Sequence, residues 1–220
     1  MKYGFCFAFL AVALLLTAIQ GGVGYIALVY PAISFAIVSI GYLGVGPMIF
    51  GKSPNGKRTW LSIVLLLPYM LLTLMTWHLI RLLSRESAIN QLNPDFILSR
   101  RLLSSEMPQS VKSVVDLTCE LSEPRNNRQM ERYLCFPILD ASSPTPGELK
   151  AFAKAILDLP KPVLIHCAQG HGRTGLIAAA VLIVSGRATN ATDAISMVQA
   201  ARPGIELNQI QRSALESING

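Results

Sequence analysis

Acidic residues are missing from the first 80 positions of this chain. The charged residues there are Lys2, Lys52, Lys57 and Arg58. Pumps and channels usually need ionisable groups inside the bilayer, so residues 1–80 give no sign of an ion or proton pathway. Over the whole chain 15% of residues are charged and 51% are hydrophobic, which is more apolar than an average soluble domain.

A nucleic-acid partner is not indicated either. The net charge is +6, but residues 81–220 carry 15 basic and 13 acidic side chains, which is an ordinary balance. The excess mostly reflects basic residues that flank apolar segments, as in membrane proteins. No internal repeat or low-complexity tract occurs.

Cysteine is scarce, and its spacing indicates neither a metal site nor a disulfide framework. The four cysteines are Cys6, Cys119, Cys135 and Cys167. Cys119 and Cys135 lie in apolar, strand-like runs, which predicts buried free thiols.

Three apolar stretches are present, at residues 4–20, 25–47 and 60–80. Each approaches the ~20 residues that a helix needs to cross a bilayer. We therefore predict an all-α transmembrane region of about three helices within residues 1–85, in contact with a lipid bilayer. The alternative for the first stretch is a cleaved signal peptide, although "AIQGG" is a poor cleavage site.

Residues 86–220 show a different pattern, in which short strands alternate with helices. Strands are predicted at 96–103, 113–118, 132–139 and 162–167, and helices at 145–159, from Arg173 to Gly186, at 191–201 and at 206–217. The first strand is expected at a sheet edge and the last, almost continuously apolar, in the centre. Helix 145–159 begins with Thr145, Pro146 and Glu148, a capping box with proline in the first turn. The fold class is therefore α/β, a central sheet flanked by helices.

The segment "HCAQGHGRTG", residues 166–175, joins a strand to a helix through a glycine-containing loop. Backbone N–H groups of such a loop and the helix N-terminus bind phosphate, and an arginine fork can hold two phosphate oxygens. The predicted substrate-binding residues are Ala168, Gln169, Gly170, His171, Gly172 and Arg173. The loop lacks the Gly-Lys-Ser/Thr ending of nucleotide-binding loops, and no Mg²⁺ ligands are evident.

Cys167 lies at the base of this loop, where the N–H groups and Arg173 would stabilise a thiolate. A thiolate there is an in-line nucleophile for phosphorus and would form a cysteinyl-phosphate. Thr174 could assist departure of the sulfur in the second step. His166 is expected to orient the loop through hydrogen bonds, because it lies on a buried strand.

Expelling an alkoxide or phenoxide requires a general acid. Asp140 is the best candidate, because it directly follows a strand and opens the loop 140–146, and strand ends carry chemistry in α/β folds. Asp116 lies inside a strand and is expected to be structural, and Asp158 lies near a helix end and is expected to be solvated.

With these residues in place, "HCAQGHGRTG" resembles the signature loop of the dual-specificity class of cysteine-dependent protein tyrosine phosphatases. "VVDLTCE", "FPILDASSPTPGELKAF" and "RPGIELNQIQ" extend the similarity over about residues 95–218, with Arg202, Pro203, Asn208 and Gln211 at family-typical spacings. The resemblance implies that Cys167 is the nucleophile, Arg173 binds phosphate, Asp140 is the general acid and Thr174 assists thiolate departure. It also implies a reaction without metal or cofactor.

The substrate class stays open between phosphorylated protein and phospholipid. Phosphoinositide phosphatases tend to carry lysines in the loop, whereas Ala168, Gln169 and His171 stand here, which argues against a polyphosphorylated headgroup. Two other functions are considered: a silent phosphate-binding pseudophosphatase and a rhodanese-like sulfurtransferase. The intact Cys167, Arg173 and Asp140 count against the first, and the second would not need Asp140.

Membrane orientation is poorly determined by charge. Lys2, Lys52, Lys57 and Arg58 on one side are matched by Arg81, Arg85, Arg100 and Arg101 on the other. A thiolate survives best in a reducing compartment, so a multi-pass protein with its catalytic domain on the cytoplasmic face is expected. The sequence leaves the oligomeric state open.

Overall fold

The computed structural model describes residues 2–218; residues 1, 219 and 220, at the outer ends of the two predicted domains, lie outside it. The chain divides into two compact units. The first consists of Met1–Ser53, Lys57–Leu83 and Cys119–Ser122, and the second of Pro54–Gly56, Ser84–Thr118 and Glu123–Gly220. The predicted boundary between residues 85 and 86 stays a proposal.

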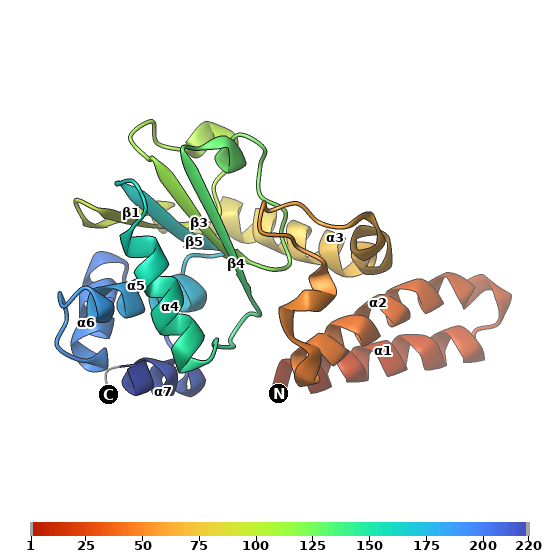
Figure 1. The fold of residues 1–220 in the computed structure, drawn as a ribbon. Coiled ribbons are helices and arrows are strands. Elements are labelled where there is room, and N and C mark those ends of the chain that lie inside the picture. Colours follow the sequence, from red (N-terminus) through yellow and green to blue (C-terminus); the bar gives the residue numbers. More distant parts are fainter. Residues whose placement is uncertain (1, 219–220) are drawn as a thin grey trace. The chain divides into compact units, whose positions relative to one another are not determined.

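The first unit is helical. Its helices are α1 (Lys2–Gln20), α2 (Val29–Ile40) and α3 (Trp60–Leu83), with the short helical turns η1 (Val23–Leu28), η2 (Gly41–Val45) and η3 (Gly46–Phe50) beside α2 (Figure 1). Within residues 2–218, three helical stretches are long and apolar enough to cross a membrane: Lys2–Gln20, Val23–Phe50 and Trp60–Leu83. They correspond to the three apolar stretches predicted from the sequence.

Aromatic rings hold this helical unit together. The ring of Phe7 on α1 stacks on Phe35 of α2 with centroids 6.0 Å apart, and it meets Tyr69 of α3 edge-on at 5.6 Å. The buried Ser39 hydroxyl of α2 donates a hydrogen bond of 2.8 Å to the carbonyl of Gly4. Away from these contacts between the helices, all three helices expose large apolar side chains, among them Phe9, Ile19, Ile33, Met75 and Leu82.

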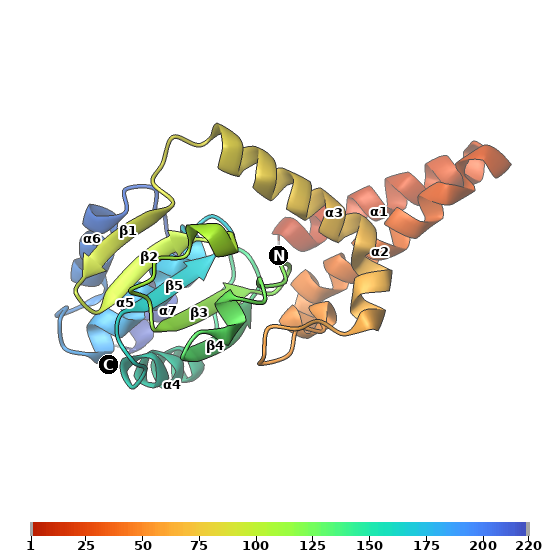
Figure 2. The ribbon, with the colours of Figure 1, turned by 90° about the horizontal axis from the view of Figure 1, so that it is seen from above.

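The second unit contains a five-stranded sheet in the order β1-β2-β5-β3-β4 (Figure 2). The strands are β1 (Ile89–Asn93), β2 (Phe96–Arg100), β3 (Ser113–Thr118), β4 (Arg132–Ile138) and β5 (Val163–Cys167). β1 is antiparallel to β2, and the other four strands run parallel. This mixed sheet confirms the predicted α/β class, with β5 in the centre.

Helices cover one face of this sheet (Figure 1). They are α4 (Pro146–Leu157), α5 (Gly172–Val184), α6 (Ala191–Ala201) and α7 (Gln209–Ile218). Every residue of α5 from Arg173 to Ile183 is buried. The opposite face carries a smaller apolar cluster around Ile97, Val114 and Leu164, near the short turns η4 (Ser104–Glu106) and η5 (Asn127–Gln129).

The expectation that residues 96–103 form an edge strand is wrong. The strand ends at Arg100 and pairs with β1 on one side and β5 on the other. A strand lies at the edge of a sheet only when no further strand pairs with its outer side. Here the polar segment "INQLN" of β1 pairs with β2, and a tight turn joins the two strands. In that turn the Asn93 side chain accepts hydrogen bonds from the backbone N–H groups of Asp95 and Phe96, at 2.9 and 3.1 Å.

Two local expectations can be compared directly with the structure. Thr145 caps α4, its Oγ1 accepting from the N–H of Glu148, whose carboxylate accepts from the N–H of Thr145 in return. The predicted capping box is therefore confirmed. Cys119 is buried as predicted, whereas Cys135 is only partly buried.

Candidate active site

The parallel strands bring their carboxyl ends to one edge of the sheet, where ligands of open α/β sheets bind. Cys167 is the last residue of β5 and is 3% exposed. The loop 168–171 follows, and α5 starts at Gly172. The N–H of Gly170 lies 3.3 Å from the Cys167 sulfur and donates to it. The thiol therefore lies beside a helix N-terminus, where negative charge is stabilised.

Gly170 is needed for the shape of this loop. Its φ is +75°, a region that disfavours residues with a Cβ. A Cβ there would also lie 2.5 Å from the carbonyl oxygen of Ser99 and 2.6 Å from the nitrogen of Arg100. Both are backbone atoms of β2 and cannot rotate away. The loop is thus packed directly against the neighbouring strand.

Arg173, in the first turn of α5, is 2% exposed and extends toward the end of β4. Its Nη1 donates a hydrogen bond of 3.0 Å to the carbonyl of Ile138, and its Nε lies 3.3 Å from Oδ1 of Asp140. The Asp140 side chain is 57% exposed. The structure thus brings together the two residues chosen as phosphate ligand and general acid, although they come from different strand ends.

Thr174 and His166 flank the loop from within the core. Thr174 is fully buried, and among residues 2–218 its Oγ1 has no hydrogen-bond partner. His166 is 1% exposed, with Nδ1 3.4 Å from the carbonyl oxygen of Cys167. This position is suited to orienting the loop.

The remaining loop positions interact with neighbouring segments. The carbonyl of Ala168 accepts from the N–H of Arg101 at 3.1 Å, and that of Gln169 accepts from Arg202 at 3.1 Å. His171 is partly exposed, with Nε2 2.7 Å from a carboxylate oxygen of Glu86.

Arg202 holds the loop through hydrogen bonds to its backbone carbonyls. Its buried guanidinium donates to the carbonyl of Gly170 at 2.8 Å, to the carbonyl of Ser87 at 2.8 Å and to the side-chain oxygen of Asn90 at 2.6 Å. Burial lowers the pKa of Arg202, and the nearby carboxylate of Glu86 opposes that effect. The loop is thus tied to the segment that precedes the sheet.

Asn208 and Gln211 secure the loop that carries Asp140. The Asn208 amide donates to the carbonyl of Ala141 at 2.8 Å, and the Gln211 amide donates to the carbonyl of Ser142 at 3.3 Å. Ala141 needs such support because its φ is +57°, an uncommon region for a residue with a Cβ. Two residues singled out by the resemblance therefore position the loop that carries Asp140.

One grouping in residues 2–218 is dense enough to suggest a metal: the ligand atoms of Asp116, Glu123 and His166 lie within 4.8 Å of one another. The donors do not fit a cation well. Both Asp116 oxygens already accept hydrogen bonds, from Thr118 and Tyr133. The Nε of Arg101 lies 3.6 Å from Oε2 of Glu123, so a positive charge already faces that carboxylate.

Sequence reasoning missed Glu86 and Glu123 among the residues around the loop. Glu123 follows the carboxyl end of β3, which shares a sheet edge with β5, so the rule that brought Asp140 forward could have found it. Glu86 precedes the first strand, and no sequence signal connected it with His171, 85 positions away.

Comparisons with known proteins point to one class of enzyme. A family model described as "Polymorphic toxin system, DSP-PTPase phosphatase" matches residues 101–187. No curated protein matches the sequence. Among solved structures, Tk-PTP in its active form is 26% identical, with a TM-score of 0.51 over 60% of this chain and 96% of its own.

Two further structures share the fold. Human DUSP28 is 18% identical, with a TM-score of 0.50 over 60% of this chain and 93% of its own. PTPMT1 in complex with PI(5)P is 17% identical, with a TM-score of 0.52 over 60% of this chain and 95% of its own. As the resemblance of the signature loop predicted, residues 101–187 match a family model of dual-specificity phosphatases, and the similar solved structures are phosphatases of the dual-specificity and protein tyrosine phosphatase type.

Proposed function

We propose that this chain is a membrane-anchored phosphatase that hydrolyses phosphomonoesters through a cysteinyl-phosphate at Cys167. The observation that supports this most is the convergence of three groups at one sheet edge. The Cys167 sulfur accepts from the loop N–H of Gly170, and the Arg173 guanidinium lies 3.3 Å from the Asp140 carboxylate.

In the first step the Cys167 thiolate attacks phosphorus in line with the ester oxygen. The S–P bond forms while the P–O bond to the leaving group breaks. Loop N–H groups and the Arg173 fork hold the other phosphate oxygens, and Asp140 donates its proton to the departing oxygen. The exposure of Asp140 supports this role, because the leaving group must face solvent.

In the second step water attacks the thiophosphate. Asp140, now a carboxylate, takes a proton from that water, and the S–P bond breaks to release inorganic phosphate and the thiolate. Thr174 donates a hydrogen bond to the departing sulfur. Its buried hydroxyl, which has no other partner among residues 2–218, supports this assignment. The residues alone account for each proton, so no cofactor enters the scheme.

Membrane anchoring is proposed from the first unit. Apolar side chains such as Phe9, Ile19 and Leu82 are exposed on helices long enough to span a bilayer, and lipid contact would remove them from water. We assign residues 1–85 to this anchor and residues 86–220 to the catalytic domain, on the cytoplasmic face.

For the substrate we propose a single phosphate group on protein or phospholipid. No lysine lies among the loop positions Ala168, Gln169 and His171, and His171 is paired with the carboxylate of Glu86. A second phosphate on the substrate would therefore approach a histidine that is already paired with a carboxylate. The negative charge of that carboxylate would disfavour its binding. Nothing in the charge distribution favours a nucleic acid.

The test is hydrolysis of para-nitrophenyl phosphate by the detergent-purified full-length protein with a chelator present. We expect metal-independent turnover that Cys167→Ser abolishes, while tungstate still protects the variant against thermal unfolding, because backbone N–H groups and Arg173 remain. Turnover by the serine variant would exclude the covalent step. If the unmodified protein binds tungstate but shows no turnover, the result would favour the pseudophosphatase. Transfer of sulfur from thiosulfate to cyanide would favour the sulfurtransferase.

A further inference from the structure

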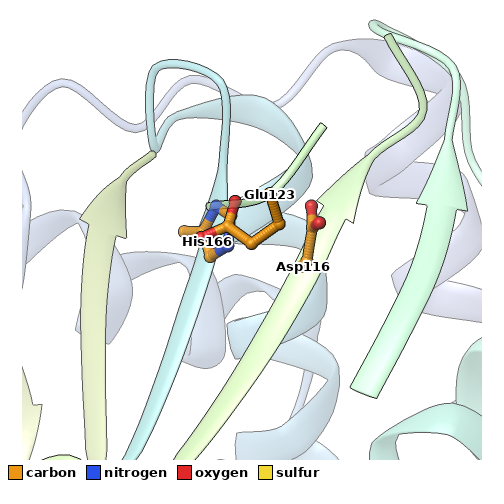
Figure 3. A group of neighbouring side chains, drawn as sticks. All are labelled: Asp116, Glu123 and His166. Atoms are coloured by element: carbon orange, nitrogen blue, oxygen red, sulfur yellow. Dashed lines mark ion pairs between the residues drawn. The ribbon is translucent and has the colours of Figure 1, made fainter. Parts of the chain in front are cut away.

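A group of three titratable side chains lies close together at the end of β5, the strand that also carries Cys167 (Figure 3). Asp116 on β3, His166 on β5 and Glu123 in the segment after β3 are all at most 4% exposed. Successive side chains of a strand point to opposite faces. Cys167 packs on the helix-covered face of the sheet, so His166 projects from the other face, where Glu123 and Asp116 lie.

Asp116 is the fixed anion of this group. One of its oxygens accepts hydrogen bonds from the N–H and the hydroxyl of Thr118, at 2.9 and 2.7 Å, and the other accepts from the Tyr133 hydroxyl at 2.6 Å. Three donors stabilise the carboxylate form. Burial and the charge of Asp116 raise the pKa of Tyr133, so its hydroxyl keeps its proton and remains a donor.

Glu123 is in a different position. One oxygen accepts from the Asn127 amide at 2.6 Å, and the other lies 3.6 Å from both the Nε of Arg101 and the Nε2 of His166. Burial raises the pKa of Glu123; His166 opposes this, Asp116 adds to it, and Arg101 opposes it. The protonation of this carboxylate is therefore decided by its neighbours.

A charge count restricts the states of the group. Asp116 and Arg101 cancel, which leaves Glu123 and His166. A buried net charge is costly, so these two side chains together hold one proton, either as a carboxylic acid beside neutral imidazole or as a carboxylate beside imidazolium. The imidazolium state places an N–H opposite the Cys167 carbonyl, 3.4 Å from Nδ1, and adds a positive charge on the residue next to Cys167 in the chain.

We propose that Glu123 is a positioning residue for the phosphatase reaction: its carboxylate keeps His166 in the imidazolium form and thereby stabilises the Cys167 thiolate from the opposite face of the sheet. This rests on the proposed function, in which Cys167 is the nucleophile. The charged and titratable groups on the same face of the sheet as the pair are Asp116 of β3, Tyr133 of β4 and Arg101 after β2; Cys167 of β5 lies on the opposite face.

The test follows alkylation of Cys167 by iodoacetamide as a function of pH in the full-length protein, with the labelled peptide read by mass spectrometry. Glu123→Gln keeps the shape of the side chain but removes the negative charge. We expect the midpoint of the alkylation curve to move upward by about one pH unit or more. An unchanged midpoint overturns the proposal.

The matched control is Glu120→Gln. Glu120 is also buried, and its carboxylate accepts a hydrogen bond from the N–H of Cys119 at 3.0 Å. It should leave the midpoint at Cys167 unchanged. Because alkylation requires no turnover, a protein that shows the shift but hydrolyses no phosphoester would refute the proposed function and leave this inference standing.

A second measurement needs no variant. The chain has three histidines, so nitrogen-15 spectra of histidine-labelled protein contain few signals. We expect one histidine, His166, to carry protons on both ring nitrogens through pH 8, where an ordinary imidazole is already neutral. A neutral His166 at a pH where Cys167 already reacts as thiolate would contradict the proposal, even if Glu123→Gln did not fold.

Discussion

At the scale of single residues, Asp140 combines exposure with an anchored backbone. Its carboxylate is more than half exposed and lies 3.3 Å from Arg173, while Asn208 holds the carbonyl of the next residue, Ala141. The proposed general acid is therefore a solvent-accessible carboxylate on a loop whose backbone is held in place.

Asp140→Asn should therefore depend on the leaving group. General acid catalysis is worth about 10²–10⁴-fold when the departing oxygen is a strong base, so hydrolysis of an alkyl phosphate should fall by about that factor. An activated aryl phosphate should lose much less, because its oxygen leaves without a proton. Single-turnover rates on the two substrates measure this, and equal losses would remove Asp140 from the role.

Sequence reasoning reached furthest where the candidate residues are local in sequence. Cys167 and Arg173 share one loop, and their spacing, together with the glycines between them and the strand and helix on either side, predicted a phosphate site. Asp140 required the further rule that parallel strands end at one edge. Glu86 could not be found this way, because its contact with His171 depends on a fold that joins positions 85 residues apart.

At the scale of elements, the start of α4 adjoins the loop of Asp140. Glu148 accepts hydrogen bonds from the hydroxyl and the N–H of Thr145, and these hydrogen bonds lower the pKa of the Glu148 carboxyl. A lowered folded-state pKa means that the carboxylate contributes stability above its unfolded value of 4.5. That contribution is lost as the pH falls through the lower folded value.

Glu148→Gln should then lower the melting temperature by about 1–3 °C at pH 7. The difference from the unmodified protein should narrow as the pH drops below 4.5. Thermal unfolding followed by circular dichroism across pH 3–7 measures it, with Glu216→Gln on the exposed side of α7 as a control. A difference that is the same at every pH would show that the cap acts through packing alone.

Helices and strands could be predicted where their sequences show a clear pattern of apolar residues. β3 and β5 are continuously buried and were placed correctly, as was the capped start of α4. β1 was missed because "INQLN" has little strand propensity, and its pairing with β2 supplies what the local sequence lacks. Missing β1 also led to the wrong edge assignment for β2.

At the scale of the whole molecule, the helices of the first unit are proposed to act as a tether. A tether raises the effective concentration of a membrane-borne substrate without altering the active site. A truncated chain that begins at residue 84 keeps the contact of Glu86 with His171. It should retain the full-length rate on para-nitrophenyl phosphate and lose about tenfold or more on a phospholipid or membrane-protein phosphate in vesicles.

The comparison needs both chains on both substrates, with circular dichroism to establish that the truncated chain is folded. A folded truncated chain that loses both activities in parallel would show that the helical unit shapes the active site. A second truncated chain beginning at residue 89 removes Glu86 and Ser87, and with them the contacts to His171 and Arg202. If only that shorter chain shows reduced turnover, the loss comes from the missing contacts that hold the phosphate loop.

The burial of α5 from Arg173 to Ile183 has a consequence for the order in which function is lost. The amides of this helix can exchange with solvent only when the core opens, so the phosphate loop attached to it survives as long as the domain does. The Asp140 loop is partly exposed and is held by a few side-chain hydrogen bonds, so it belongs to the less protected part of the domain. Mild denaturant should therefore leave an enzyme that still captures phosphate and still forms the thiophosphate from activated esters, but has lost acid assistance.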